Sequence, residues 1–143
     1  MTHYEHFYID GAWVEPLERC TLDVIDPSTE AAFATIAIGS SADVDRACRA
    51  ARAAFPAFAA TTREERIALL ERIVAVYQRR YQEFAVAISR EMGAPIGLAT
   101  RAQAAMAVAH FTTAIEVLRH YPFEEEMGAT RLFREPIGVC ALI

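Results

Sequence analysis

The chain has 143 residues, 54% hydrophobic and 23% charged, a balance typical of a folded globular protein. Its formal net charge of −5 argues against a nucleic-acid partner, because nucleic-acid binding normally needs a basic patch. All 14 basic residues are arginines, so lysine-nucleophile and Schiff-base chemistry are excluded within these residues.

The first residues mix charged and apolar side chains, which excludes a signal-peptide core there. No apolar run approaches the roughly 20 residues that cross a bilayer. The three cysteines, an odd number, fit a reduced compartment better than a disulfide framework. We therefore expect a cytoplasmic protein without a membrane partner.

Short strands are predicted at the start of the chain. Asp10-Gly11 is a strong hairpin signal between apolar strands over 7–9 and 12–14. Two further strands are expected over 22–27 and 32–38, with a turn between them. The first helix is expected to begin near Ser41 as N-cap, with apolar residues from Val44 to Phe58 along one face.

The second predicted helix begins at a capping box formed by Thr62 and Glu65 and ends at Gly93. It would be about 30 residues, or roughly 45 Å, long, and Arg79 and Glu83 are placed to pair along it. A compact domain of this size has a radius of gyration near ~14 Å. Such a helix would overhang its own domain, which suggests further structure against which it packs.

The third predicted helix runs from about Pro95 or Ile96 to Tyr121. Its apolar residues wrap more than one face, so we expect it to contact protein on two sides. An acidic link over 124–126 and a strand over 131–134 follow.

The last segment, Ile137–Ile143, is continuously apolar and rich in β-branched residues. That pattern is typical of a strand buried on both faces of a parallel sheet, which needs a covering helix and a partner strand. Neither follows in the sequence. We therefore expect the front of a larger α/β protein whose chemistry lies beyond residue 143.

No catalytic constellation is found in these residues. Cys48 and Cys140 are expected to pack in apolar surroundings, and nothing near Cys20 in sequence would activate its thiol. His3 and His6 are assigned to a terminal tail rather than to a metal site. The remaining candidates also have ordinary readings: His110 as a packing residue, Glu124–Glu126 as a solvated link and Gly138 as a lone glycine rather than a phosphate loop.

Taken in order, six segments from about Phe7 to Ile143 resemble the N-terminal part of the NAD(P)-dependent aldehyde dehydrogenase superfamily. They are Tyr8-Ile9-Asp10-Gly11-Ala12-Trp13, Val24-Ile25-Asp26-Pro27-Ser28-Thr29-Glu30, Ala42 to Ala47 with Ala50 to Pro56, Arg63-Glu64-Glu65-Arg66, Glu91-Met92-Gly93-Ala94-Pro95 and Arg134-Glu135-Pro136-Ile137-Gly138-Val139. Each is weak alone, but their order and spacing together are specific.

The resemblance implies an α/β fold, the N-terminal portion of a three-layer aldehyde dehydrogenase-like architecture. Residues 1–40 would form the edge β-hairpin and strands. Residues 41–122 would form three long helices of the cofactor-binding domain. Residues 123–143 would form an arm strand that leads into the first parallel strand, so that the domain is incomplete.

The resemblance also implies an activity. In this family a cysteine thiolate attacks an aldehyde to give a thiohemiacetal, hydride passes to NAD or NADP, and a glutamate activates the water that releases a carboxylic acid. These catalytic residues are all expected downstream, and none of the three cysteines matches the nucleophile. Coenzyme-A-acylating relatives share this opening and remain an open alternative.

Two minor sites carry over by resemblance. Ile143 would lie at the rim of the cofactor cleft. Ile25 (or Val24) and Glu91 match positions where some members hold Na⁺ or K⁺, although this chain has Asp26 where asparagine is common and Glu91 where aspartate often occurs.

Partners implied by the resemblance are an aldehyde substrate and further copies in a homodimer or homotetramer. The alternative is a non-enzymatic oligomerisation or interaction module that keeps only this part of the fold.

Overall fold

The computed structural model describes residues 2–142. Three short strands form one sheet in the order β1-β5-β4, with β1 parallel and β4 antiparallel to β5. A separate hairpin, β2-β3, turns through Asp10 and Gly11, which both have the positive φ angles that such a turn requires. These strands are β1 (Thr2–Tyr4), β2 (Phe7–Ile9), β3 (Ala12–Val14), β4 (Thr21–Asp26) and β5 (Ala31–Ala37).

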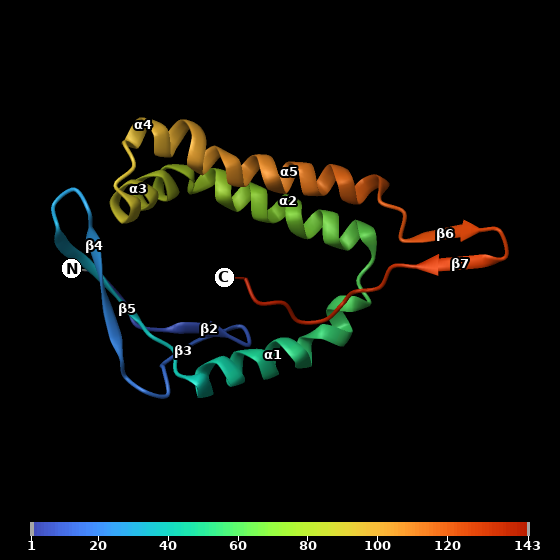
Figure 1. Ribbon diagram of the computed structural model, residues 1–143, viewed down its shortest axis with the longest axis horizontal. Coiled ribbons are helices and arrows are strands. Elements are labelled where there is room, and N and C mark those ends of the chain that lie inside the picture. Colours follow the sequence, from blue (N-terminus) through green and yellow to red (C-terminus); the bar gives the residue numbers. More distant parts are fainter. Residues whose placement is uncertain (1, 143) are drawn as a thin grey trace.

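Helices make up the middle of the chain. They are α1 (Ser41–Ala59), α2 (Arg63–Arg79), α3 (Tyr81–Met92), α4 (Ile96–Leu98), a π-helical turn η1 (Ala99–Gln103) and α5 (Ala104–His120). In Figure 1, α2 and α3 lie alongside the α4–α5 run in an antiparallel pair, and α1 lies apart from that pair. The hairpin of β6 (Glu124–Met127) and β7 (Thr130–Phe133) projects away from the rest of the chain (Figure 1).

The first helix is capped one residue earlier than expected. Ser40 is its N-cap and forms a capping box with Asp43, because its hydroxyl accepts a bond from the Asp43 amide while the Asp43 carboxylate accepts one from the Ser40 amide. The apolar face of α1 is largely exposed: Val44 is 58% and Phe58 54% exposed. The expected packing of Cys48 is therefore wrong for this chain, since no described element covers that side chain.

The expected long second helix is interrupted at Arg80, whose φ of −103° and ψ of 12° separate α2 from α3. The predicted capping box of Thr62 and Glu65 is confirmed. The ion pair forms between Arg80 and Glu83, at 2.8 Å, instead of between Arg79 and Glu83, because the break turns Arg80 toward the following turn.

Two further segments, residues 2–4 and the acidic residues 124–126, differ from their predictions. Residues 2–4, expected to be a tail, pair with β5, and the His3 ring lies 2.7 Å from the Thr35 hydroxyl. The acidic link is strand β6: Glu126 pairs with Arg131 in register, and Arg131 also lies 3.0 Å from Glu124, so that cross-strand charges support the hairpin.

The C-terminal segment is not a strand in this structure. Residues 134–142 have no regular secondary structure, and Ile137 and Leu142 are 93% and 99% exposed. Cys140 is likewise exposed rather than packed. An apolar strand needs a neighbour to satisfy its backbone, and no described strand pairs with this segment.

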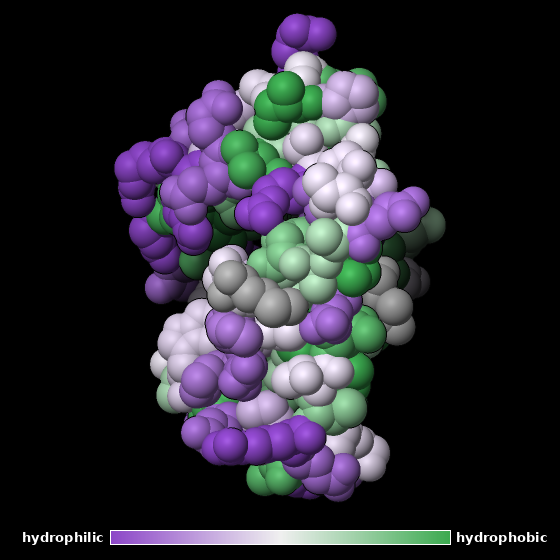
Figure 2. Space-filling model, turned by 90° about the vertical axis from the view of Figure 1, so that its left-hand side faces the viewer, coloured by the Kyte–Doolittle hydropathy of each residue, from purple (hydrophilic) through white to green (hydrophobic). Residues whose placement is uncertain are grey.

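Little of the described chain is buried. The buried hydrophobic residues are Ile9, Ala34, Ala85, Ala99, Ala104 and Ile115. Half of them, Ala85, Ala99 and Ala104, are alanines of the two helical runs, where small side chains let helices approach closely, and Ala34 lies in β5. The view of the sheet end in Figure 2 shows apolar side chains reaching the surface among charged ones. No helix of the described residues is both long enough and apolar enough to cross a membrane.

Candidate functional site

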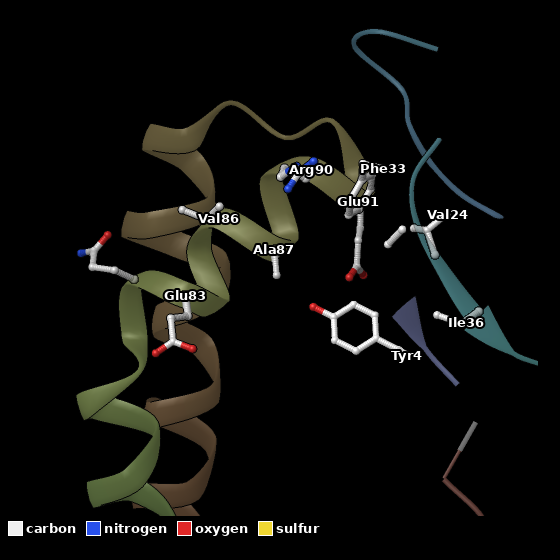
Figure 3. Close-up of a pocket in the computed structure, with 11 residues that line it drawn as sticks. Tyr4, Val24, Phe33, Ile36, Glu83, Val86, Ala87, Arg90 and Glu91 are labelled. Carbon is white, nitrogen blue, oxygen red and sulfur yellow. The ribbon is translucent and has the colours of Figure 1, made fainter. Parts of the chain in front are cut away.

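A groove of about 500 Å³ lies between helix α3 and the β1-β5-β4 sheet. Figure 3 shows its lining side chains. The residues that form it are Tyr4, Val24, Phe33, Ala34, Ile36, Gln82, Glu83, Val86, Ala87, Arg90 and Glu91. It therefore joins residues of β1, β4, β5 and α3 and has an apolar floor with charged groups along the helix side.

A bulge shapes the sheet side of the groove. The pairing of β4 with β5 shifts between Val24 and Ile25, so that Val24 faces Ala34, Ile25 faces Ala32, and Phe33 has no residue opposite it. Such bulges redirect side chains and are frequent next to functional sites. Here Phe33 lies under the Arg90 guanidinium, whose carbon is 4.1 Å from the ring centroid, and this cation–π contact connects sheet and helix.

Glu91 comes from the last turn of α3 and is held there by the end of the helix. Gly93, with a φ of 70°, accepts the left-handed conformation that stops the helix. In Figure 3 the Glu91 carboxylate and the Tyr4 hydroxyl point into the same part of the groove. Both are hard oxygen atoms, the kind that Na⁺ and K⁺ prefer.

The structure brings Val24 and Glu91 into the same groove, whereas the Ile25 side chain is 47% exposed and does not line it. Beside them, hydrogen bonds from the Ser28 hydroxyl and amide, at 2.6 and 2.9 Å, lower the pKa of Asp26, and the charge of Arg90 acts in the same direction. Asp26 thus keeps its negative charge at this edge.

Within residues 2–142, no group of three or more histidine, cysteine or acidic side chains could hold a metal ion. Cys20, Cys48 and Cys140 are exposed, as is His110, and none of them lines this groove. Ile143, expected at the rim of a cofactor cleft, lies outside the described residues. The groove can therefore contribute oxygen ligands, but its side chains do not form a nucleophile and base.

Sequence reasoning missed Tyr4 and the contact of Arg90 with Phe33. Strand β1 has only three residues and pairs with β5 in parallel, across 32 residues of sequence. Three residues are too few to show the alternation of apolar and polar side chains that identifies a strand. Phe33 was visible as an aromatic in a strand, but its partner could be known only from the bulge.

Comparison with known proteins shows which family the chain resembles. The sequence model described as "Aldehyde dehydrogenase family" matches residues 13–143. A 3-succinoylsemialdehyde-pyridine dehydrogenase from Pseudomonas sp is 45% identical over all of this chain, which covers 30% of that protein. A putative aldehyde dehydrogenase from Staphylococcus aureus is 41% identical with the same coverage.

Solved structures agree. A mutant of aldehyde dehydrogenase C from Pseudomonas syringae, in complex with NAD⁺ and octanal, matches 93% of this chain with a TM-score of 0.91 and 44% identity, over 27% of its own length. The aldehyde dehydrogenase from Bartonella henselae matches 91% with a TM-score of 0.88 and 39% identity, over 28% of its own length. The chain thus spans about 30% of the length of its curated relatives and corresponds to the N-terminal region of their fold. It belongs to the aldehyde dehydrogenase family.

Proposed function

We propose that these residues serve as the N-terminal part of an oxidoreductase that oxidises an aldehyde to a carboxylic acid with NAD or NADP, through a cysteine thiohemiacetal. The observation that carries the proposal is the match of nearly the whole chain, at a TM-score of 0.91, to a protein solved with NAD⁺ and octanal. The nucleophile, the glutamate and the cofactor contacts would come from residues outside this segment.

We expect this chain to contribute little to the binding of a dinucleotide. Gly138 is the one glycine between Arg134 and Leu142, and those residues form no strand-to-helix turn that could hold a pyrophosphate. We expect Ile143 to reach only the rim of the cofactor cleft. The role of the described residues is then to supply helices and strands against which the cofactor-binding sheet packs.

Exposed apolar faces support this packing role. Val44 and Phe58 on α1, Ile73 and Val76 on α2, and Ile137 after β7 all present large side chains to solvent in this chain. Exposed apolar surface of this kind marks an interface. We infer that further parts of the fold cover it, and that the chain alone associates in solution.

We also propose a monovalent cation, Na⁺ or K⁺, in the groove. Glu91 would supply a carboxylate oxygen and the backbone of Val24 or Ile25 a carbonyl, with further ligands from outside this segment. Isothermal titration of the chain and of its Glu91→Gln variant with NaCl and KCl, against a choline chloride control, tests this. Equal heats for both proteins would contradict it.

The test of the main proposal is a chimera. This chain replaces the matching segment of the Pseudomonas syringae enzyme in its unmutated form; the solved variant of that enzyme is 44% identical to this chain. We expect the chimera to form NADH from octanal, and the 143-residue chain alone to form none. An inactive chimera that folds as well as its parent would contradict the proposed role, and NADH formed by the chain alone would contradict the assignment of catalysis to other residues.

A second candidate is a non-enzymatic interaction module, favoured by the β6-β7 hairpin. This hairpin projects from the rest of the chain (Figure 1), and its strand edges are open to pairing with another chain. The same edges would join subunits of a homodimer or homotetramer in the enzyme. Association of the chain without support of activity by the chimera would favour the module.

A further inference from the structure

Two irregularities in neighbouring helices face each other. The break at Arg80 separates α2 from α3, and the π-helical turn η1 interrupts the run from α4 to α5. In η1 the Ala104 amide donates to the Ala99 carbonyl, five residues back instead of four. A π-turn is rare because it places one extra residue in the helix.

Tyrosine hydroxyls connect the two irregularities. The Tyr77 hydroxyl donates to the Ala104 carbonyl at 2.9 Å, and the Tyr81 hydroxyl donates to the Thr100 carbonyl. Both rings are partly buried and lie on either side of the break. Burial raises the pKa of Tyr77, and the neighbouring Tyr81 adds to the shift, so Tyr77 stays a protonated donor.

The other end of the same helix pair is also fixed. The Arg63 guanidinium, at the start of α2, donates to the carbonyls of Arg119 and Tyr121 at the end of α5. If η1 relaxed into regular α-helix, every residue after it would move by about 1.5 Å and rotate by about 100° relative to α2. The carbonyls at the end of α5 would then leave Arg63. The tyrosine hydroxyls and the Arg63 guanidinium can therefore all keep their carbonyl partners only while the extra residue stays wound in the π-turn.

We propose that Tyr77 and Tyr81 hold the π-turn in place and thereby set the register of α5 against α2, a conformational device that is independent of the proposed function. Without the two hydroxyls the turn relaxes into α-helix, and the contacts of Arg63 at the far end are lost with it. A purely local role for the tyrosines would leave Arg63 unaffected.

A double-mutant cycle on the full 143-residue chain tests this, with urea unfolding at one fixed protein concentration as the readout. We expect Arg63→Ala to lower the folding equilibrium constant about fivefold in the parent chain, since it removes hydrogen bonds. In the Tyr77→Phe/Tyr81→Phe background we expect the same change to cost less than about twofold, because coupled sites are not additive. Equal losses in both backgrounds overturn the proposal.

Tyr8→Phe is the control background, because the Tyr8 hydroxyl has no hydrogen-bond partner among the described residues and should leave the Arg63 effect unchanged.

A second measurement tests the proposal by another route if the Tyr77→Phe/Tyr81→Phe variant does not fold well enough for the cycle. Deletion of Ala102, within η1, should lower the urea midpoint of the parent chain and raise that of the Tyr77→Phe/Tyr81→Phe chain. A deletion that shifts both midpoints alike, or that leaves both chains unfolded, also overturns the proposal.

Discussion

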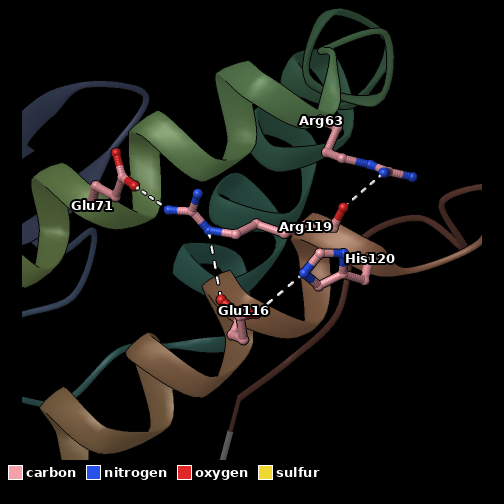
Figure 4. A network of polar contacts seen from close by, with 5 residues as sticks. All are labelled: Arg63, Glu71, Glu116, Arg119 and His120. Carbon is pink, nitrogen blue, oxygen red and sulfur yellow. Dashed lines mark hydrogen bonds and ion pairs between the residues drawn. The ribbon is translucent and has the colours of Figure 1, made fainter.

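Arg63, the first residue of α2, donates a hydrogen bond of 2.7 Å to the backbone carbonyl of Tyr121, 58 residues later in the chain. Its other terminal nitrogen reaches the carbonyl of Arg119 at 2.9 Å. Figure 4 shows the contact of Arg63 with Arg119 beside ion pairs that join Arg119 to Glu71 and Glu116, and beside a 3.2 Å contact between His120 and Glu116. One side chain thus satisfies two carbonyls that the end of α5 leaves without helical partners.

Replacing Arg63 should separate the two helix ends. We expect Arg63→Ala to lower the free energy of unfolding by about 1 kcal/mol. Arg63→Lys should lie in between, because an ammonium keeps the charge but does not span two carbonyls in a fixed fork. Urea denaturation at fixed protein concentration measures both. Arg72→Ala is the matched control, since Arg72 is exposed on the same helix and has no hydrogen-bond partner among the described residues. An equal loss for Arg72→Ala would contradict the assigned contact.

Acid should destabilise the chain through Asp43. Its side chain is 3% exposed, and burial alone would raise its pKa. Hydrogen bonds from the Leu17 amide at 3.0 Å and from the Ser40 amide and hydroxyl at 3.0 and 2.8 Å outweigh this and lower the pKa. The stabilisation is therefore complete above the unfolded-state pKa of about 4 and is lost as the pH falls through the lower folded-state value.

Asp43→Asn should lower the melting temperature at neutral pH and flatten its acid dependence below pH ~4. Thermal melts across an acid series measure this. Asp45→Asn, an exposed acid on the same helix, should change neither the neutral melting temperature nor the slope appreciably. A slope in Asp43→Asn as steep as in the parent chain would show that other groups cause the acid sensitivity.

Two neighbouring serines at the start of α1 should differ in their effect on stability, because Ser40 is the N-cap and Ser41 is the first helical residue. Ser40→Ala removes the hydroxyl that accepts from the Asp43 amide at 3.3 Å, and an N-cap loss costs about 1 kcal/mol. Ser41→Ala changes an exposed first-turn residue and should cost little. Chemical denaturation of both variants distinguishes them, and a larger loss at Ser41 would restore the assignment made from sequence alone.

Local signals in the sequence were sufficient for the capping box at Thr62, the turn at Asp10-Gly11 and the helix stop at Gly93, because each depends on residues a few positions apart. What failed depends on distant partners. Three features depend on which elements pack against each other: the break at Arg80, the exposure of Cys48 and the strand formed by residues 2–4. The pattern of apolar residues along the chain does not contain that information. In the groove, Glu91 and Val24 were both named from the sequence, whereas the place of Phe33 depends on a register shift that only strand pairing reveals.

The end of α3 offers a matched pair of glycines for a final prediction. Gly93 has a φ of 70°, and a Cβ there would lie 2.8 Å from Cγ of Pro27. Gly97 lies in α4, where a Cβ would meet only the movable Arg101 guanidinium at 3.3 Å.

Gly93→Ala should therefore cost at least about 1 kcal/mol for the left-handed backbone, and more for the contact with the proline ring. It should also loosen the groove, because the turn that holds Pro27 against α3 would shift. Gly97→Ala should be neutral or stabilise by up to about 1 kcal/mol, through higher helix propensity. Urea unfolding gives both values, with limited proteolysis after Arg90 as a local readout. Because the two changes add the same methyl group four residues apart, losses of similar size would mean that neither the backbone angle nor the approach to Pro27 decides the outcome.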